Sequence, residues 1–296
     1  MTADARTAAS DRTVRGTSPG GVRWIESGPG DPDAAGVPVV LLHGLTDSAA
    51  CWPTVLPRLA ATRRVLAFDA RGHGGTPLPD EPFTVSALAE DVAEALTALD
   101  LGPVLVVGHS MGGVTAEQLA LAHPGLVAGL VLEDPAWRDG TEADGMPGWL
   151  VTEIARVADL SVEQIAAAGR ESMPGWSDAE VLGWAESETG LDPRLAAVPH
   201  RWAERDWVEA LAELRVPVTL LTAGEAHGCV VRPAQVERAV ELLGAAPDGL
   251  LTHVPLPHVG HNIRREAPAA YLAALDAEVA RADRAAGVGS TAGADG

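Results

Sequence analysis

Lysine is absent from this sequence and cysteine is scarce, and both shortages limit what the chain can do. The 21 basic residues are all arginines and stand against 41 acidic residues, which gives a formal net charge of −20. Nucleic acids and anionic membranes bind basic surfaces, so we expect neither as a partner. The two cysteines, Cys51 and Cys229, make neither a disulfide framework nor a metal-ligand spacing, so no metal ion is expected.

Long apolar runs are missing as well. None approaches the length of a transmembrane helix, and the polar stretch 1–21 lacks the apolar centre of a signal peptide. We therefore expect a soluble, cytoplasmic protein, because free thiols persist in that reducing compartment. Residues 1–21 and the Gly- and Ala-rich stretch 286–296 are predicted to be disordered. The sequence leaves open whether the chain forms a homo-oligomer.

Short apolar runs alternate with helical patterns over most of the chain. The runs are rich in β-branched residues and are bounded by turn residues, as buried parallel strands are. They lie at 22–26, 37–42, 64–68, 104–108, 127–132, 217–222 and 250–254. This alternation predicts an α/β fold with a doubly wound, mostly parallel sheet.

The alternation stops between residues 136 and 210. That stretch holds helical patterns punctuated by Pro and Gly, and it contains six of the eight tryptophans. We predict that it is a helical cap, or lid, inserted into a core made of residues 22–135 and 211–285.

The sequence Gly108-His109-Ser110-Met111-Gly112 joins the central predicted strand to a helical pattern. A G-x-S-x-G sequence in that position is typical of a nucleophile elbow, in which the glycines permit a tight turn and the serine is raised above the sheet. The helix N-terminus beside the serine favours developing negative charge. Ser110 is therefore the candidate nucleophile, and chance occurrence of the pattern is the alternative explanation.

A serine hydroxyl needs a general base, and nine histidines compete for that role. His261 lies in Gly260-His261-Asn262 after the last predicted strand, which would place it at the same edge of the sheet as Ser110. His258 is its nearest rival. His109 cannot easily face its neighbour Ser110, and we expect it to pack beneath the serine.

The reaction of a serine with a carbonyl group also needs two N–H donors that converge on the oxyanion. The residue after the nucleophile, Met111, is expected to supply the first. The second is expected from Leu45, because it follows a predicted strand that ends in His43-Gly44.

Four motifs together resemble the α/β-hydrolase superfamily, over residues 22–285. They are Leu42-His43-Gly44, Asp69-x-Arg71-Gly72-His73-Gly74, the elbow around Ser110, and Gly260-His261-Asn262. The resemblance implies a serine hydrolase without a cofactor, and a structural role for the loop that holds Asp69, Arg71 and His73. Relatives that hydrolyse epoxides or remove halides carry aspartate at the elbow, so neither reaction is expected.

The sequence departs from the family's usual position for the acid. The loop after the penultimate predicted strand has His227 where the family commonly has aspartate. Some members take the acid from the end of the strand that follows the nucleophile helix, which is Glu133-Asp134 in this chain. We therefore predict Asp134 as the acid, with Glu133 and then Glu225 as alternatives. A turn cap before Pro135 is the structural alternative for Asp134.

We call the loop that follows His43-Gly44 and carries Leu45 the oxyanion loop. Two tryptophans, Trp52 and Trp137, are close in sequence to this loop and to Asp134, and we predict that they line an apolar substrate pocket. The expected reaction is hydrolysis of an ester, lactone or related acyl bond in a small to medium, partly apolar molecule. A carbon–carbon bond hydrolase and a cofactor-free perhydrolase are alternatives on the same fold. A non-catalytic receptor for a small ligand is the alternative from another class, and His227 motivates it.

Overall fold

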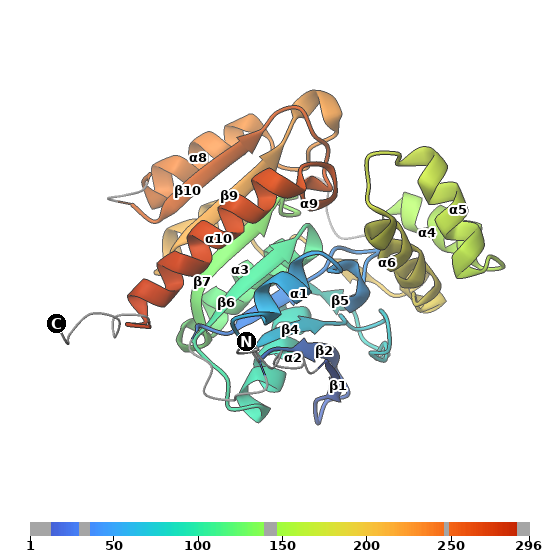
Figure 1. The fold of residues 1–296 in the computed structure, drawn as a ribbon, viewed down its shortest axis with the longest axis horizontal. Coiled ribbons are helices and arrows are strands. Elements are labelled where there is room, and N and C mark those ends of the chain that lie inside the picture. The colour runs from blue at the N-terminus through green and yellow to red at the C-terminus, as the bar shows by residue number, and fades with distance from the viewer. Residues whose placement is uncertain (1–12, 30–35, 139–146, 246–248, 289–296) are drawn as a thin grey trace, which may run out of the picture.

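The computed structural model describes residues 13–29, 36–138, 147–245 and 249–288. Its core is an eight-stranded sheet with the order β1-β2-β4-β3-β6-β7-β9-β10 (Figure 1). These strands are β1 (Val14–Thr17), β2 (Arg23–Ser27), β3 (Val39–Leu42), β4 (Val65–Phe68), β6 (Val104–His109), β7 (Val127–Glu133), β9 (Val218–Ala223) and β10 (Leu251–Leu256). Neighbours from β4 to β10 pair in parallel, whereas β2 is antiparallel to both β1 and β4. The prediction of a doubly wound, mostly parallel sheet is confirmed.

Strand β1 corrects the prediction for the N-terminal arm. Its four residues pair with β2, with Val14 opposite Glu26 and Thr17 opposite Arg23. The hairpin turn between the strands includes Gly21 with a φ of +90°, a conformation that glycine adopts without steric cost. The predicted disorder is therefore wrong from Val14 onward. Residues 1–12 and 289–296, on which most of the remaining disorder predictions fall, lie outside the described residues.

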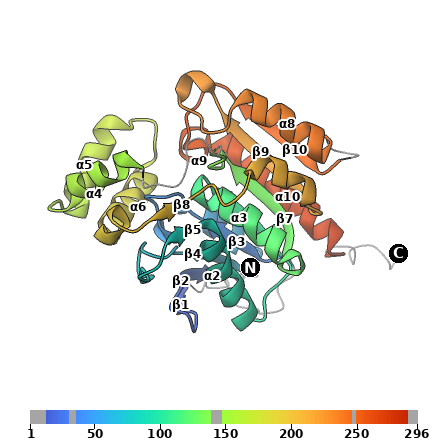
Figure 2. The same ribbon diagram turned by 180° about the vertical axis from the view of Figure 1, so that it is seen from behind.

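Helices cover both faces of the sheet (Figures 1 and 2). On one face lie α1 (Val55–Ala60), α9 (Ile263–Glu266) and α10 (Pro268–Ala285), and on the other lie α2 (Val85–Ala98), α3 (Met111–Ala122) and α8 (Pro233–Leu243). Successive strand residues point to opposite faces, so Val40 and Leu42 pack with α2 and α3 while Val39 and Leu41 pack with α1 and α10. Single 3₁₀ turns are η1 (Ala49–Cys51), η2 (Pro124–Leu126), η3 (Pro193–Ala196), η4 (Leu211–Glu213) and η5 (Glu225–His227).

Between β7 and β9 the chain forms α4 (Gly148–Val157), α5 (Val162–Ser172) and α6 (Asp178–Thr189), which lie together at one end of the molecule (Figures 1 and 2). Helices α5 and α6 share a small apolar cluster of their own, which includes Ile165 and Val181. The predicted cap stretch also contains β8 (His200–Arg201), which pairs with β5 (Phe83–Thr84), and α7 (Trp207–Ala210). Trp202 and Trp207 in this stretch belong to the main core cluster.

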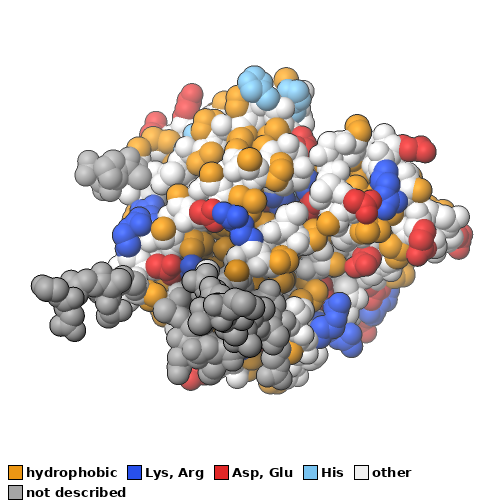
Figure 3. Space-filling view, viewed as in Figure 1, with side chains coloured by type: hydrophobic (Ala, Val, Ile, Leu, Met, Phe, Trp, Pro, Cys, Tyr) orange, Lys and Arg blue, Asp and Glu red, His pale blue; other side chains and the backbone are white. Residues whose placement is uncertain are grey.

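Helix α6 attaches the cap helices to the core. The Ser187 and Ser48 hydroxyls are 2.7 Å apart, and Thr54 donates a hydrogen bond of 2.7 Å to Glu180. Gly183 lets the helix backbone approach η1 closely, because a Cβ at that position would lie 2.5 Å from the Ala50 carbonyl oxygen. Elsewhere on the cap helices, arginine and acidic side chains are interspersed on the face seen in Figure 3.

No helix in the described parts of the chain combines the length and the apolar character that a membrane span requires.

We predict that Gly183→Ala lowers the free energy of unfolding by about 1–3 kcal/mol, because the new methyl group collides with a backbone oxygen that cannot rotate away. The loss should appear although alanine is the better helix former. Gly175→Ala is the matched control, since no atom lies within 4 Å of its Cβ position. Urea unfolding of both variants measures the difference, and equal midpoints for the two would contradict the prediction.

Helix α3 is buried along most of its length and carries a buried acid, Glu117. Trp137 donates its indole N–H to Glu117 Oε2 at 2.8 Å, while Oε1 has no hydrogen-bond partner among the described residues. Burial raises the pKa of Glu117 to about 8, so the carboxyl group is neutral in the folded protein at pH 7.

This burial predicts a loss of stability on the alkaline side. The folded protein keeps the Glu117 proton up to about pH 8, whereas an unfolded chain releases it near pH 4.5, the ordinary pKa of a glutamate side chain. The protonated Glu117 side chain therefore contributes its whole stabilisation below pH 4.5. This contribution to the free energy of unfolding is lost as the pH rises towards 8, at a rate of at most ~1.4 kcal/mol per pH unit. Glu117→Gln should flatten the unfolding free energy between pH 5 and 8, as measured by urea unfolding. The exposed control Glu213→Gln should follow the wild type, and parallel curves for all three proteins would refute the prediction.

Candidate active site

Ser110 lies at the sharp turn between β6 and α3. Its φ of +52° is in the left-handed region, which a serine seldom adopts. Two glycines allow the turn: a Cβ on Gly108 would lie 2.2 Å from the Gly112 carbonyl oxygen, and one on Gly112 would lie 2.1 Å from the Leu42 carbonyl oxygen. The turn places Ser110 on the wall of a pocket of about 270 Å³.

His261 lines the same pocket and is held by Asp134. The Nδ1 atom of His261 is 2.7 Å from Asp134 Oδ2, and the N–H groups of Val230 and Val231 donate to the same carboxylate at 2.8 and 3.1 Å. Since a carboxylate accepts, Nδ1 carries the proton and Nε2 is left as the basic nitrogen of the neutral ring. An imidazole oriented in this way can accept a proton from a serine hydroxyl.

The alternative acids do not reach His261. The Glu133 carboxylate is buried and accepts hydrogen bonds from the backbone N–H of Arg264 at 2.7 Å and from its guanidinium at 3.4 Å. Glu225 and His227 lie in η5 with exposed side chains, and His258 is exposed as well. Of the acids that the sequence suggested, Asp134 is the one that the structure brings to His261.

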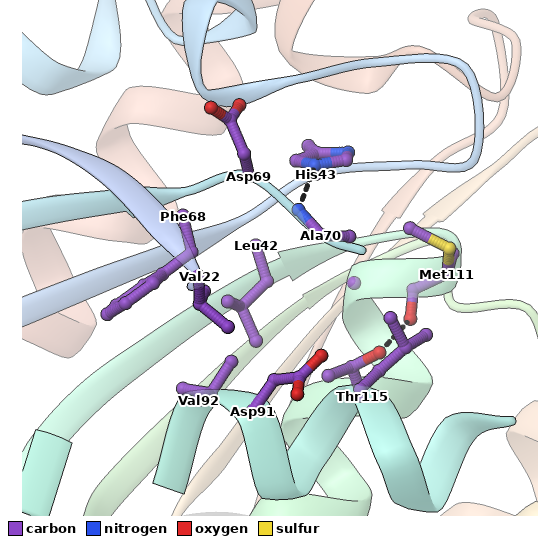
Figure 4. Close-up of a pocket in the computed structure, with 12 residues that line it drawn as sticks. Val22, Leu42, His43, Phe68, Asp69, Ala70, Asp91, Val92, Met111 and Thr115 are labelled. Atoms are coloured by element: carbon purple, nitrogen blue, oxygen red, sulfur yellow. Dashed lines mark hydrogen bonds between the residues drawn. The ribbon is translucent and has the colours of Figure 1, made fainter. Parts of the chain in front are cut away.

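The peptide group between Gly44 and Leu45 is oriented by His43. The Gly44 carbonyl accepts from His43 Nδ1 at 2.7 Å and from the Asp47 N–H at 3.0 Å. In a trans peptide the N–H points away from the carbonyl, so the Leu45 N–H is directed to the opposite side, and Leu45 lines the pocket. Burial lowers the pKa of His43, and its neutral ring accepts the Ala70 N–H at Nε2, 3.0 Å away (Figure 4).

Met111 is the first residue of α3, so its N–H has no partner within the helix. Its side chain turns to the core and lines a separate cavity of about 20 Å³ together with Val22, Leu42 and Thr115 (Figure 4). That volume is about the size of one water molecule. The Met111 backbone N–H is therefore free of helix bonding next to Ser110, while the Met111 side chain packs in the core behind the elbow.

The loop of Asp69, Arg71 and His73 supports the oxyanion loop from behind. Asp69 accepts the Ala49 N–H at 2.8 Å, and Arg71 makes two hydrogen bonds of 2.8 Å to Asp91. His73 contacts the Leu45 carbonyl oxygen through Nε2. These contacts agree with the structural role that the family resemblance implies for this loop.

A buried group of charges lies at the site, and two of its members, Asp47 and Arg265, line the pocket. Asp47 accepts from Arg264 and from Arg265, each at 2.8 Å, and Arg265 also contacts Glu180 of α6 at 3.4 Å. Burial alone would raise the pKa of Asp47, but the Arg265 and Arg264 guanidinium groups hold it well below its usual range. The ionised Asp47 therefore joins the oxyanion loop, the helix after His261 and the cap helices.

The cap helices and the turn between α5 and α6 supply one part of the pocket wall. It consists of Trp149 in α4, Trp184 in α6, and Met173 and Trp176 between α5 and α6. Trp176 and Trp184 meet edge to face with ring centroids 6.4 Å apart.

The two tryptophans predicted to contact substrate are not on this wall. Trp52 is 1% exposed and its ring lies 4.6 Å from the Arg264 guanidinium, while Trp137 is 3% exposed and bonds Glu117. Both pack in the core, so that prediction is wrong. Their proximity in sequence to the site did not reveal which way their side chains point.

Sequence analysis did not identify Asp47, Arg264 or Arg265 as part of the site. One available signal was the pair of adjacent arginines three residues after His261 in a chain with a large acidic excess. Among the residues that the structure describes, no three His, Cys, Asp or Glu side chains are grouped to hold a metal ion. Cys51 and Cys229 are free, and burial raises the pKa of the Cys51 thiol to about 12.

Comparisons with known proteins agree with this fold. The model of the alpha/beta hydrolase family matches residues 39–275. A segment of 122 residues, which is 40% of the chain, aligns with 39% of the sn-1-specific diacylglycerol lipase ABHD11 of Xenopus laevis, and the aligned residues are 38% identical. A segment of 164 residues, which is 55% of the chain, aligns with 59% of lipase LipV of Mycobacterium tuberculosis, and the aligned residues are 32% identical. The matches thus span about two fifths to three fifths of these curated relatives.

Among solved structures, esterase RhEst1 from Rhodococcus sp. ECU1013 superimposes with a TM-score of 0.66 and 26% identity, over 90% of this chain and 98% of that one. The enol-lactonase from Burkholderia xenovorans LB400 does so with a TM-score of 0.64 and 21% identity, over 89% of this chain and 98% of that one, which shows a shared fold.

We predict that Asp47→Asn lowers the free energy of unfolding by about 3–5 kcal/mol, because it leaves two buried guanidinium groups without their shared anion. Asp276→Asn is the matched control. It breaks an ion pair with Arg58 in which both side chains are about half exposed, and it should leave the free energy of unfolding nearly unchanged. Urea unfolding at pH 7 compares the two, and similar losses for both variants would rule out a buried network.

Proposed function

The chain belongs to the alpha/beta hydrolase family, and we propose that it hydrolyses a carboxylic ester or lactone of a small, partly apolar molecule through an acyl-enzyme formed on Ser110. One observation carries the proposal: His261 is hydrogen-bonded to Asp134 through Nδ1 and shares a pocket with Ser110. A diacylglycerol lipase, a lipase and an esterase among the proteins similar to this chain support the same reaction class.

In the proposed mechanism the Ser110 hydroxyl attacks the substrate carbonyl carbon and passes its proton to His261 Nε2. Asp134 stabilises the imidazolium that results, through its bond to Nδ1. The N–H groups of Leu45 and Met111 donate to the oxyanion of the tetrahedral intermediate. His261 then gives the proton to the leaving alcohol, and the acyl group stays on Ser110. A water molecule that loses a proton to His261 releases the acid in the second half of the reaction.

The substrate class follows from the pocket wall. Trp149, Met173, Trp176 and Trp184 offer apolar and aromatic surface, and about 270 Å³ is slightly below the usual range of 300–1,000 Å³ for ligand sites. A compact substrate suits this space. The acidic excess of the chain disfavours nucleic acid as a partner, and we propose a small molecule as its ligand in the cytoplasm.

The hypothesis of a non-catalytic receptor depended on a missing carboxylate for His261. Asp134 Oδ2 lies 2.7 Å from His261 Nδ1, so a histidine at position 227 does not leave His261 without a carboxylate.

Hydrolysis of short and medium p-nitrophenyl esters tests the proposal. Ser110→Ala should abolish turnover, and Asp134→Asn should lower kcat by about 10⁴-fold, because the amide no longer holds the imidazole in the required tautomer. Glu225→Gln is the matched control and should retain the wild-type rate. Labelling of the wild type, and not of Ser110→Ala, by a fluorophosphonate identifies the nucleophile independently of the ester chosen. Full activity of Asp134→Asn would contradict the assignment of the acid. A wild-type protein that neither hydrolyses the esters nor reacts with the fluorophosphonate would contradict the proposed function.

A further inference from the structure

His109 packs directly against His261. The two rings have centroids 4.6 Å apart and planes tilted by 41°. The side chain of His109 is 4% exposed and comes from the last residue of β6, a strand that is buried along its whole length. A rigid imidazole therefore lies beside the proposed general base, and the mechanism above gives it no role.

His109 also bonds the backbone of His261. Its Nε2 atom is 3.2 Å from the His261 carbonyl oxygen. A carbonyl oxygen only accepts, so Nε2 carries the proton and Nδ1 of the neutral ring does not. Nδ1 is buried without a hydrogen-bond partner among the described residues, 3.7 Å from Asp47 Oδ2. The Nε2 proton of His109 is therefore directed at the main chain of the proposed base.

The His109 ring is neutral, and its charge state affects the protonation of the adjacent His261. Burial lowers the pKa of His109 to about 3, and the charges of Arg264 and His261 lower it further while Asp47 opposes them. A neutral ring at this distance allows His261 to gain a proton without repulsion between two cations. Asp134, bonded to His261 Nδ1 at 2.7 Å, supplies the negative charge that favours the imidazolium.

The space for this ring is provided by Gly44. A Cβ at that position would lie 2.8 Å from His109 Nδ1 and 3.5 Å from Ser110 Cβ. The oxyanion loop, the elbow and the His261 loop therefore meet around His109. The side chain of His261 is 27% exposed and, like His109, lines the pocket.

We propose that His109 is a positioning residue for His261: its ring contact and its hydrogen bond to the His261 carbonyl hold the imidazole where it meets both Asp134 and Ser110. This inference rests on the proposed function of Ser110 and His261. Because a displacement of about 1 Å of a reacting group can cost about 10²-fold in rate, loss of the hydrogen bond should lower kcat and leave substrate binding little changed.

Two amide variants test the hydrogen bond. His109→Gln places an amide nitrogen near the position of Nε2, whereas His109→Asn carries the same amide one methylene shorter and cannot reach the His261 carbonyl. We expect kcat for a p-nitrophenyl ester to fall about 10- to 100-fold in His109→Asn, with KM within about 3-fold, and to stay within about 5-fold of wild type in His109→Gln. Equal kcat values for the two variants, whether both high or both low, would overturn the proposal.

A spectroscopic readout separates this inference from the proposed function. We expect the proton between His261 Nδ1 and Asp134 to give a far-downfield signal in the NMR spectrum of the protein labelled with ¹⁵N-histidine. The signal should persist in wild type and His109→Gln and broaden or vanish in His109→Asn; persistence in all three would overturn the proposal.

If His109→Asn does not fold, as judged by thermal unfolding, His109→Phe replaces it, because it keeps a ring and lacks the donor. Failure of the wild type to react with esters or a fluorophosphonate would contradict the proposed function alone, since the proton signal still reports the position of His261.

Discussion

The pairing of Asp47 with Arg264 and Arg265 is the interaction on which the geometry of the site depends. Charges this deeply buried are stable only when they are paired and hydrogen-bonded. The three side chains therefore fix the distances between the segments that carry them. Those segments are the oxyanion loop, the helix that follows His261, and, through Glu180, the cap helix α6. The stability of the fold and the alignment of the site thus rest on the same contacts.

Backbone strain is concentrated at the proposed catalytic residues. Ser110 and Asp134 have φ values of +52° and +39°, and Asp100 is the other described non-glycine residue with a positive φ. Such conformations cost on the order of 1–3 kcal/mol and persist when surrounding contacts hold them. The holding contacts are backbone hydrogen bonds from Ser110 to Glu133 at 3.0 Å and from Asp134 to Leu221 at 2.9 Å. Strands β7 and β9 therefore support both turns.

The cap helices combine a firm attachment with an apolar inner wall. Helix α6 approaches η1 closely and is hydrogen-bonded to it through Ser187 and Ser48. Trp149 in α4 is half exposed and lies on the pocket wall. The side of the pocket next to Arg265 is thus fixed by buried charges, while the side at α4 faces solvent.

Much of this protein could be predicted from the sequence. Short apolar runs predicted seven of the eight strands of the main sheet, though not β1, and glycine spacing predicted the elbow at Ser110, because both depend on local backbone chemistry. The position of His261 after the last strand followed from the rule that parallel strands end at one edge. Asp134 was chosen over Glu133 by its place at the strand tip, and the structure turns these neighbours in different directions.

Other features were decided by the tertiary structure alone. Asp47 and Arg264 are 217 residues apart in sequence, and no local pattern relates them. Trp52 and Trp137 share their apolar character with Trp176 and Trp184, yet the first two pack in the core and the last two face the pocket. Sequence determines which side chains are apolar or charged. Which of them meet depends on how distant elements pack against one another, and that packing placed the cap tryptophans, the buried arginines and His109 around the site.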